Sequence, residues 1–530
     1  MNKLKVCILS AVTALMAQTA TANPWIKAES AHFVVYSDAD AQMTQQYVNK
    51  LEAFHTVASQ IYTSIRPPLF PQHTKTRAYF METVDEFYNV RPEIGYGRFM
   101  PLWTCEDGDE MFSTPEIEFN NSADGVMGDK IKRDLNLDLG VLYSAYNKSL
   151  LLHTFGRLPR WAVEGLDDYV LTAVIQDDKV QLGSPSPHIS EIYTNDGFID
   201  VTSSNYFIPF KDLIADKPFE KQGRGAFEFE SWVMVHHLMS DTDRREKFAH
   251  YLRLVSDGMS SSEAYNQSIG IPDEEFAKTI KDYFNVGVPY LTYSYAGEGA
   301  AQASISALPH YHQEVPLLEA ATRTCPGVAQ SKKLMNWLQK AAIETPDDEL
   351  TQQALARAEI NSGMPEASKT WLTGAVERNP DNFDNLFLLG RAYLALAERA
   401  DATDRTESYK QARTYLARAA ALDPSSPPVL YYYARAHADL PDYPDKDTLN
   451  AVALSESYSH FHPLYQAELL VRVGDYSAAA EPVADLLNWT DKDKKTKIDL
   501  LTKIKAAIDA HQPVETILPL MVDYEALSRQ

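Results

Sequence analysis

The stretch from Leu139 to Tyr169 constrains the fold of this chain most, because it places two helices in direct succession with a sharp break between them. The first helix is predicted from Asp134 to His153, where apolar residues recur at steps of three and four. Those residues are Leu135, Leu139, Leu142, Tyr146 and Leu150. Gly156 and Pro159 interrupt the pattern, and Trp161 begins the second helix. The sequence therefore predicts two consecutive helices joined by a short turn.

The second of these helices carries a motif. Pro159 to Tyr169 reads PRWAVEGLDDY, which resembles the P-x-W-x-x-E-G-L-A-x-Y segment of gluzincin-type metallopeptidases. The resemblance implies that Glu164 corresponds to the third zinc ligand of those enzymes. It also implies that the preceding helix should carry His-Glu-x-x-His, which supplies the other two ligands and the general base. That helix reads Ser-Ala-Tyr-Asn-Lys at residues 144–148 instead.

The residues that replace the metal-binding motif cannot support metal-assisted hydrolysis. Two His four residues apart share one face of a helix and can hold one metal ion between them. Ser144 is a poor neutral zinc ligand, and Ala145 can carry no proton. Lys148 places a cation where the metal ion would sit, and the two would repel strongly. We therefore expect no catalytic residue, no metal ligand and no cofactor, the ancestral zinc site being lost.

We expect an ion pair between Lys148 and Glu164 to take the place of the metal ion, with an N–O distance of about 4 Å or less. The residues of this vestigial active site are Ser144, Ala145, Lys148, Glu164 and Trp161. Four others are candidates to line the former cleft, namely Tyr146, Asp168, His236 and His237. The two His are consecutive, so at most one of them faces any given site.

An active hydrolase remains the alternative to a non-catalytic protein. Ser144 and Lys148 would form a nucleophile and base pair if Lys148 had a depressed pKa. An atypical metal site would need a shifted ligand such as His153. That residue lies nine positions after Ser144, on the opposite side of the helix, and a place near the helix end explains it more simply.

The first residues have the pattern of an export signal. Lys3 and Lys5 precede an apolar stretch from Val6 to Met16, and Ala20-Thr21-Ala22 is a small-residue cleavage pattern. We expect residues 1–22 to be a cleaved signal peptide and the protein to be periplasmic or secreted in a bacterium. No other segment approaches the roughly 20 apolar residues of a spanning helix, so no membrane span is expected.

The small number of cysteines is compatible with an exported protein, but it does not show whether they form a disulfide. Cys105 and Cys325 remain after removal of the signal peptide. They either form a disulfide or stay as free thiols, and sequence alone gives no distance between them.

Length and charge limit the other possibilities. At 530 residues the chain exceeds what one hydrophobic core usually supports, so we expect two or three domains. The formal net charge of −24 argues against nucleic acid or an anionic membrane as a partner.

The first domain is predicted over residues 23–290. Trp25 to Ser37 reads WIKAESAHFVVYS, and residues 231–238 read SWVMVHHL. Together with Pro159 to Tyr169, these segments resemble the peptidase MA-like domain of exported bacterial proteins. The resemblance implies an α+β, zincin-like fold that is mostly helical with a small sheet.

Residues 291–332 are expected to be a loop-rich linker, because prolines and glycines occur there without sustained periodicity. Residues 333–530 resemble tetratricopeptide (TPR) repeats. The strongest unit contains Leu386 to Tyr393 and ends at Leu422-Asp423-Pro424, and a preceding unit ends at Asn379-Pro380. We expect three or four irregular helical hairpins that stack into an all-α solenoid with a concave groove.

These observations favour an exported, non-catalytic pseudo-peptidase that acts as a scaffold. Its partner would be a protein or peptide that binds in the groove of the repeats, and the former cleft offers a second surface for binding.

Overall fold

The computed structural model describes residues 24–70, 74–83, 85–91, 111–113, 143–171, 173–176, 179–183, 208–216, 224–286, 291–294, 302–309, 313–324, 326–399, 403–456, 462–490 and 494–528. The expected signal peptide, Cys105, Cys325 and the first part of the predicted helix at 134–142 lie outside these ranges. We call the described residues up to 309 the N-terminal domain and those from 313 the repeat region.

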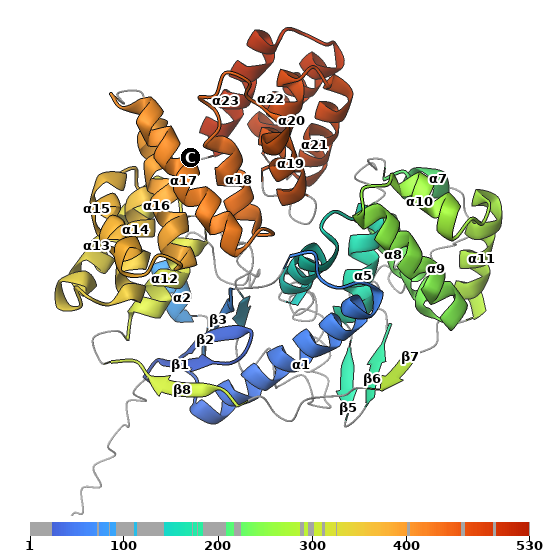
Figure 1. Cartoon of the computed structure of the whole chain (residues 1–530), viewed down its shortest axis with the longest axis horizontal. Helices are drawn as coiled ribbons and strands as arrows, with labels where there is room; N and C mark the ends of the chain where they lie inside the picture. Colours follow the sequence, from blue (N-terminus) through green and yellow to red (C-terminus); the bar gives the residue numbers. More distant parts are fainter. Residues whose placement is uncertain are drawn as a thin grey trace, which may run out of the picture.

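A five-stranded sheet forms one end of the N-terminal domain, in the order β4-β3-β2-β1-β8 (Figure 1). The strands are β1 (Ile26–Glu29), β2 (Phe33–Ser37), β3 (Thr76–Phe80), β4 (Met111–Ser113) and β8 (Ser304–Ala307). β2 pairs with β3, and β3 with β4, in parallel, whereas β1 pairs antiparallel with β2 and β8. The apolar run in β2 buries Phe33 and Val35, which anchors the sheet in the core.

Helix α1 (Ala41–Ile65) contacts β1 and β2 and extends from this sheet toward the rest of the domain (Figure 1). Asp40 caps its first turn by accepting a hydrogen bond from the backbone N–H of Met43. Its buried face includes Tyr47, Leu51 and Tyr62, at helical spacing. The helix therefore carries one continuous apolar face between the two ends of the domain.

The other end of the domain combines a small sheet with several helices. Its three strands pair antiparallel in the order β5-β6-β7 and are β5 (Val174–Gln176), β6 (Lys179–Leu182) and β7 (Leu291–Ser294). Residues 143–155 are helical. The further helices at this end are α5 (Arg160–Leu171), α7 (Phe210–Ile214), α8 (Arg224–Met239), α9 (Thr242–Ser256), α10 (Ser261–Ser268) and α11 (Asp273–Val286), whereas α2 (Asp85–Val90) lies at the large-sheet end beside α12 (Figure 1).

One hydrophobic core joins these elements. Tyr146, Trp161 and Phe248 have no exposed surface, and Trp232 is 1% exposed. Trp161 of the predicted motif packs against Phe248 on α9, with ring centroids 5.9 Å apart. The α+β character expected of this domain is present, while the match to a zincin-like fold stays a prediction.

The segment expected to be a loop-rich linker, residues 291–332, is structured. It contains β7, β8, α12 (Val315–Arg323) and the start of α13, which begins at Val328. β8 joins the large sheet by pairing with β1. β8 reads SISA, which is a very short alternation of polar and apolar residues, and all four residues are exposed. Backbone pairing with β1, rather than side-chain burial, holds this strand in place.

The repeat region is a succession of helices in which each helix contacts the next. They are α12 (Val315–Arg323), α13 (Val328–Glu344), α14 (Glu349–Asn361), α15 (Pro365–Arg378), α16 (Phe383–Ala397), α17 (Arg405–Leu422), α18 (Pro427–Arg435), α19 (Lys446–Ser455), α20 (Pro463–Arg472), α21 (Tyr476–Trp489), α22 (Lys495–Asp509) and α23 (Val514–Ser528). The described residues thus hold twelve helices here, more than three or four hairpins would contain.

The strongest predicted repeat unit has the expected architecture. α15 and α17 end just before Asn379-Pro380 and Asp423-Pro424. Gly390 on α16 allows a close approach to α17, since a Cβ there would lie 2.6 Å from Cγ of Leu416. The later helices were harder to recognise because α18 and α19 are short, at nine and ten residues.

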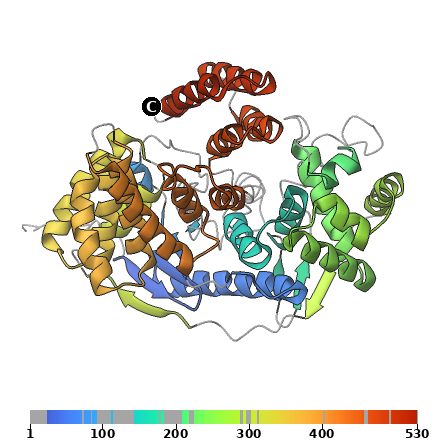
Figure 2. The ribbon, with the colours of Figure 1, turned by 45° about the horizontal axis from the view of Figure 1, so that its top comes forward.

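Figure 2 shows the N-terminal domain and the repeat region as two sides of a crescent. The early repeats lie beside the large sheet, and the C-terminal helices lie over α5. Within the ranges that the structure describes, none of the helices is both long and apolar enough to cross a bilayer.

Gly165 sets the distance between α5 and α8, and we expect Gly165→Ala to destabilise the protein. A Cβ at this position would lie 2.3 Å from the carbonyl oxygen of Ser231 and 2.5 Å from Cγ2 of Val235. Because backbone cannot swing aside, the helices must separate, and such overpacking costs about 1–3 kcal/mol. Thermal unfolding of the purified variant would show a lower midpoint.

The matched control is Gly374→Ala in α15, where the nearest atom to a new Cβ is Nη1 of the flexible Arg378 at 3.3 Å. Alanine is favoured over glycine in a helix by about 0.5–1 kcal/mol, so this variant should unfold at the same or a higher temperature. Equal losses in both variants would contradict a specific close packing of α5 on α8.

Candidate functional site

A charged cluster lies where the helix at 143–155 faces α5. Nζ of Lys148 lies 2.8 Å from Oε1 of Glu164, so the predicted ion pair is confirmed. The same ammonium lies 3.8 Å from Oδ2 of Asp167. Ser144 donates a hydrogen bond to that Oδ2 atom, and the amide of Asn147 donates to Oδ1 at 2.8 Å. Asp167 is therefore the shared acceptor of the helix at 143–155.

Electrostatics explain how these charges coexist. Burial by itself lowers the pKa of Lys148, but attraction to Glu164 and Asp167 outweighs it, and the net pKa is raised. Burial raises the pKa of Asp167 to about 6, although Lys148 opposes the shift. Burial and the nearby charges of Asp167 and Glu164 hold the pKa of Asp168 well above its usual range. Lys148 is thus a fixed cation in an acidic surrounding.

The donors at this place do not fit a zinc ion. Glu164 is present, but the ammonium of Lys148 occupies the position beside it, and an ammonium donates hydrogen bonds and cannot ligate a metal. Among the side chains that the structure describes, three or more His, Cys, Asp or Glu do not come together so as to hold a metal ion. We therefore assign no metal-dependent step to these residues.

The geometry also disfavours the Ser144/Lys148 dyad. A general base must be able to lose its proton, and the raised pKa of Lys148 keeps it protonated. The hydroxyl of Ser144 donates to Asp167, while the ammonium of Lys148 donates to Glu164. The hydrogen bonds of both side chains thus go to carboxylates and not to each other, although the ammonium of Lys148 also lies 3.8 Å from Asp167.

Three residues expected along the former cleft lie in the core instead. Tyr146 is fully buried, and its hydroxyl is hydrogen-bonded to Nδ1 of His55 at 2.6 Å. His236 is fully buried and hydrogen-bonded to the hydroxyl of Tyr283, and His237 is 3% exposed. All three rings are amphipathic and pack among aromatic side chains, which accounts for their burial. Asp168 is half-buried on α5, beside the charged cluster.

His153 lies at the boundary with the repeat region. Its Nδ1 atom is 2.8 Å from the carbonyl oxygen of Ser149, in the same helix, and its Nε2 atom is 3.5 Å from Oδ1 of Asp423. The sequence placed it near a helix end, which is correct, but gave no sign of a contact 270 residues away.

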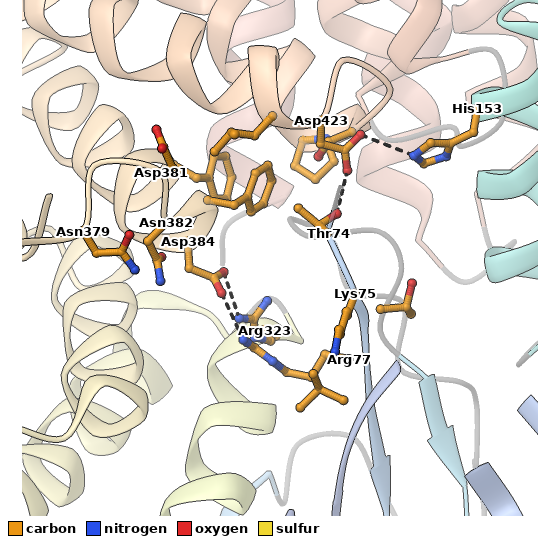
Figure 3. Close-up of a pocket in the computed structure, with 17 residues that line it drawn as sticks. Thr74, Lys75, Arg77, His153, Arg323, Asn379, Asp381, Asn382, Asp384 and Asp423 are labelled. Atoms are coloured by element: carbon orange, nitrogen blue, oxygen red, sulfur yellow. Dashed lines mark hydrogen bonds and ion pairs between the residues drawn. The ribbon is translucent and has the colours of Figure 1, made fainter. Parts of the chain in front are cut away.

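The second feature is a pocket of about 390 Å³ between the N-terminal domain and the repeat region (Figure 3). Residues near β3 and the end of the helix at 143–155 form one wall, including Thr74, Lys75, Arg77 and His153. Residues of α12 and of the turns before α16 and α18 form the other, including Arg323, Asn379, Asp381, Asn382, Asp384 and Asp423. Pockets between domains are common ligand sites.

Ion pairs hold the two walls together. Arg77 on β3 lies 2.7 Å from Glu319 on α12 and 3.0 Å from Asp384 on α16. Arg323 contacts the same two carboxylates, Asp384 at 3.3 Å. Glu319 is 1% exposed, and burial raises its pKa, an effect that the nearby Arg77 opposes. The sheet is thus attached to the early repeats by these ion pairs together with a buried apolar cluster that includes Tyr79 and Leu334.

A second contact joins α5 to the later repeats. Arg160 lies 3.1 Å from Asp485 on α21 and 3.2 Å from Asp216. Thr74 also donates to Asp423 at 3.1 Å. The N-terminal domain therefore contacts both the early and the later repeats.

Sequence reasoning missed Asp167 and the pocket for different reasons. Asp167 stands where the peptidase segment has Ala, so a departure from the motif was visible. The residues of the pocket are scattered between positions 34 and 428 and share no linear motif. The closing turns at Asn379-Pro380 and Asp423-Pro424 were recognised, but only as helix ends.

The chain was compared with protein families, with curated proteins and with solved structures. No protein-family model and no curated protein sequence matches the chain. A solved structure that is similar is a thermophilic TPR protein from Thermus thermophilus, at 18% sequence identity and a TM-score of 0.31, covering 37% of this chain and 98% of that one. The helices themselves define a helical-repeat protein with an α+β domain packed on its repeats.

The raised pKa of Asp167 predicts a pH dependence. The folded protein holds this proton up to about pH 6, whereas an unfolded aspartate releases it near its ordinary value of 3.8. The protonated Asp167 therefore adds to the free energy of unfolding below pH 3.8. This contribution is lost as the pH rises from there through about 6. Asp167→Asn cannot ionise. We expect the unfolding midpoint of the wild type to fall relative to that of the variant across this window, with a constant difference above about pH 7.

Asp509→Asn, on the exposed surface of α22, serves as the control and should follow the wild type at every pH. Parallel curves for Asp167→Asn and the wild type between pH 4 and 6 would show that Asp167 is ionised throughout this range.

Proposed function

We propose that this protein is an exported, non-catalytic pseudo-peptidase that binds a protein or peptide partner, in the periplasm or outside the cell. Its N-terminal domain retains the scaffold of a peptidase MA-like domain without the metal chemistry. The repeat region, which resembles TPR repeats, supplies the other half of the binding surface.

The pocket between the two parts carries this proposal. It has a volume of about 390 Å³ and combines charged groups, side-chain amides and two phenylalanine rings in its lining. Such a mixture suits a polypeptide segment, which presents backbone donors and acceptors together with apolar side chains. Helical repeats stack into surfaces that accept extended segments, which fits the same class of partner.

The charged cluster on α5 supports the non-catalytic part of the proposal. Lys148 pairs with Glu164 at 2.8 Å and lies near Asp167, so an ammonium balances carboxylates that a metal ion would otherwise balance. Lys148 keeps its proton and donates to Glu164, so it does not serve as a general base for Ser144.

The vestigial-site part can be tested by rebuilding the motif. A variant with Ser144→His, Ala145→Glu and Lys148→His should bind one zinc ion per chain, because Glu164 completes a three-residue ligand set. Adding Glu164→Gln should weaken binding by about tenfold or more. Metal content of the dialysed proteins gives the measurement, with the wild type as control. A triple variant that holds no zinc would show that these helices lack the geometry of a metal site.

The binding part can be tested by site-specific photocrosslinking. A photoreactive phenylalanine analogue in place of Phe383, which lines the pocket, should capture a polypeptide from the exported fraction of the producing cells. The same analogue in place of Ile343, which is 81% exposed on α13, is the matched control. Equal capture at both positions, or none at Phe383, would contradict binding in the pocket.

A further inference from the structure

We infer that the pocket between β3 and the repeat region binds a short zwitterionic peptide of two or three residues, with its carboxylate toward one wall and its ammonium toward the other. This inference rests on the proposed function, because it names the chemical class of ligand for the same site. It follows from the distribution of charge around the pocket, from its apolar patch and from its size.

The wall at the base of the pocket is basic. Three guanidinium groups, those of Arg77, Arg323 and Arg357, surround the carboxylates of Glu319 and Asp384. Arg77 and Arg323 line the pocket, whereas Arg357 lies behind them. A guanidinium carries five N–H donors, so a ligand carboxylate can accept hydrogen bonds from the two that line the pocket.

Lys75 extends the same basic wall. Its ammonium lies 2.7 Å from Glu29, which also pairs with Lys27 at 3.0 Å. Two ammonium groups again share one carboxylate. Exposed pairs of this kind are weak, so Lys75 can turn toward a ligand at little cost.

The opposite wall is acidic. In Figure 3, Asp381 and Asp423 lie on the far side of the pocket from Lys75 and Arg77. Asp423 accepts hydrogen bonds from Thr74 and Ser425 and lies 3.5 Å from Nε2 of His153. Burial by itself raises the pKa of Asp423, but the contact with His153 outweighs it, and the net pKa is lowered. Asp381 is exposed at the mouth of the pocket. The carboxylates of this wall would attract an ammonium group.

The lining of the pocket also has an apolar part, to which both the N-terminal domain and the repeats contribute. This apolar patch consists of Val34, Phe383, Phe387, Leu422 and Pro428. A compact cavity of 390 Å³ is about 9 Å across. An extended chain rises by about 3.3–3.6 Å per residue, so two or three residues span it and place one side chain on the patch.

Ligands with charge of one sign fit less well. A polyanion would meet Asp381 and Asp423 as well as the overall charge of −24. A simple cation would meet Arg77 and Arg323. A zwitterion with an apolar side chain satisfies both walls and the patch.

The test is titration calorimetry of the full chain with the tripeptide Ala-Leu-Ala in four forms: free, N-acetylated, C-amidated and blocked at both ends. We expect the free form to bind with a Kd below about 1 mM. Blocking either end should weaken binding by about tenfold, since each removes one charge-assisted contact. The doubly blocked form should show no binding.

Two exposed residues allow the orientation to be checked. Asp381→Asn should weaken the free tripeptide about fivefold or more and leave the N-acetylated form unchanged. Lys75→Gln should weaken the free tripeptide similarly and leave the C-amidated form unchanged. Asp509→Asn and Lys278→Gln, which change exposed charges on α22 and α11, are the matched controls and should have no effect.

Equal affinity for the free and doubly blocked forms would overturn the inference, as would no binding of any form at about 5 mM. If the tripeptide fails while crosslinking at Phe383 still captures a polypeptide, the inference alone is wrong. If both fail, the proposed function is wrong as well.

Discussion

The ion pairs that join Arg77 on β3 to Glu319 on α12 and to Asp384 on α16 hold the N-terminal domain against the repeat region. Glu319 and Arg357 are each 1% exposed, so their charges have little access to water. Removing one partner of a buried pair leaves an uncompensated charge and costs roughly 3–5 kcal/mol. These pairs act together with a buried apolar cluster across the same boundary, in which Tyr79 and Met81 of the N-terminal domain pack with Leu334 and Leu338 of α13.

The same rule governs the charged cluster on α5. Lys148 would be costly to bury alone, and Asp167 would be costly to bury without donors. Lys148 provides a positive charge near Asp167, and Asp167 provides a carboxylate near Lys148. Glu164 pairs with Lys148, while Ser144 and Asn147 donate hydrogen bonds to Asp167. Asp167 and Lys148 are both departures from the peptidase pattern, and the structure brings them within 3.8 Å of each other. A domain that balances its charges internally in this way can keep its shape without a metal ion.

The parts predicted well from sequence depend on contacts between residues near in the chain. The turn at Gly156 and Pro159, the helix that begins near Trp161 and the Lys148–Glu164 pair all follow from spacing within one helical pair. The ends of α15 and α17 follow from the prolines after them. Tyr146, His236 and His237 were placed along a cleft because a helix pattern does not say which polar rings enter the core.

Neither the pocket nor the position of β8 could be predicted from the sequence, because both are formed by segments that lie far apart along the chain. β8 is only four residues long, is exposed at all four, and is held by pairing with β1, which is far away in the sequence. The contact between His153 and Asp423 joins positions 270 residues apart. Neither residue type is unusual where it stands, so no local pattern marks the contact.

By itself, the sequence determined where several helices end, such as α15 and α17, that the residues of the metal-binding motif are absent, and that Lys148 pairs with Glu164. These follow from helical spacing and from the chemistry of single side chains. Only the tertiary structure decided that the repeats pack against the N-terminal domain and that opposite charges line the pocket between them. Charge complementarity across a domain boundary depends on which surfaces meet, and that is set by the packing of the whole chain.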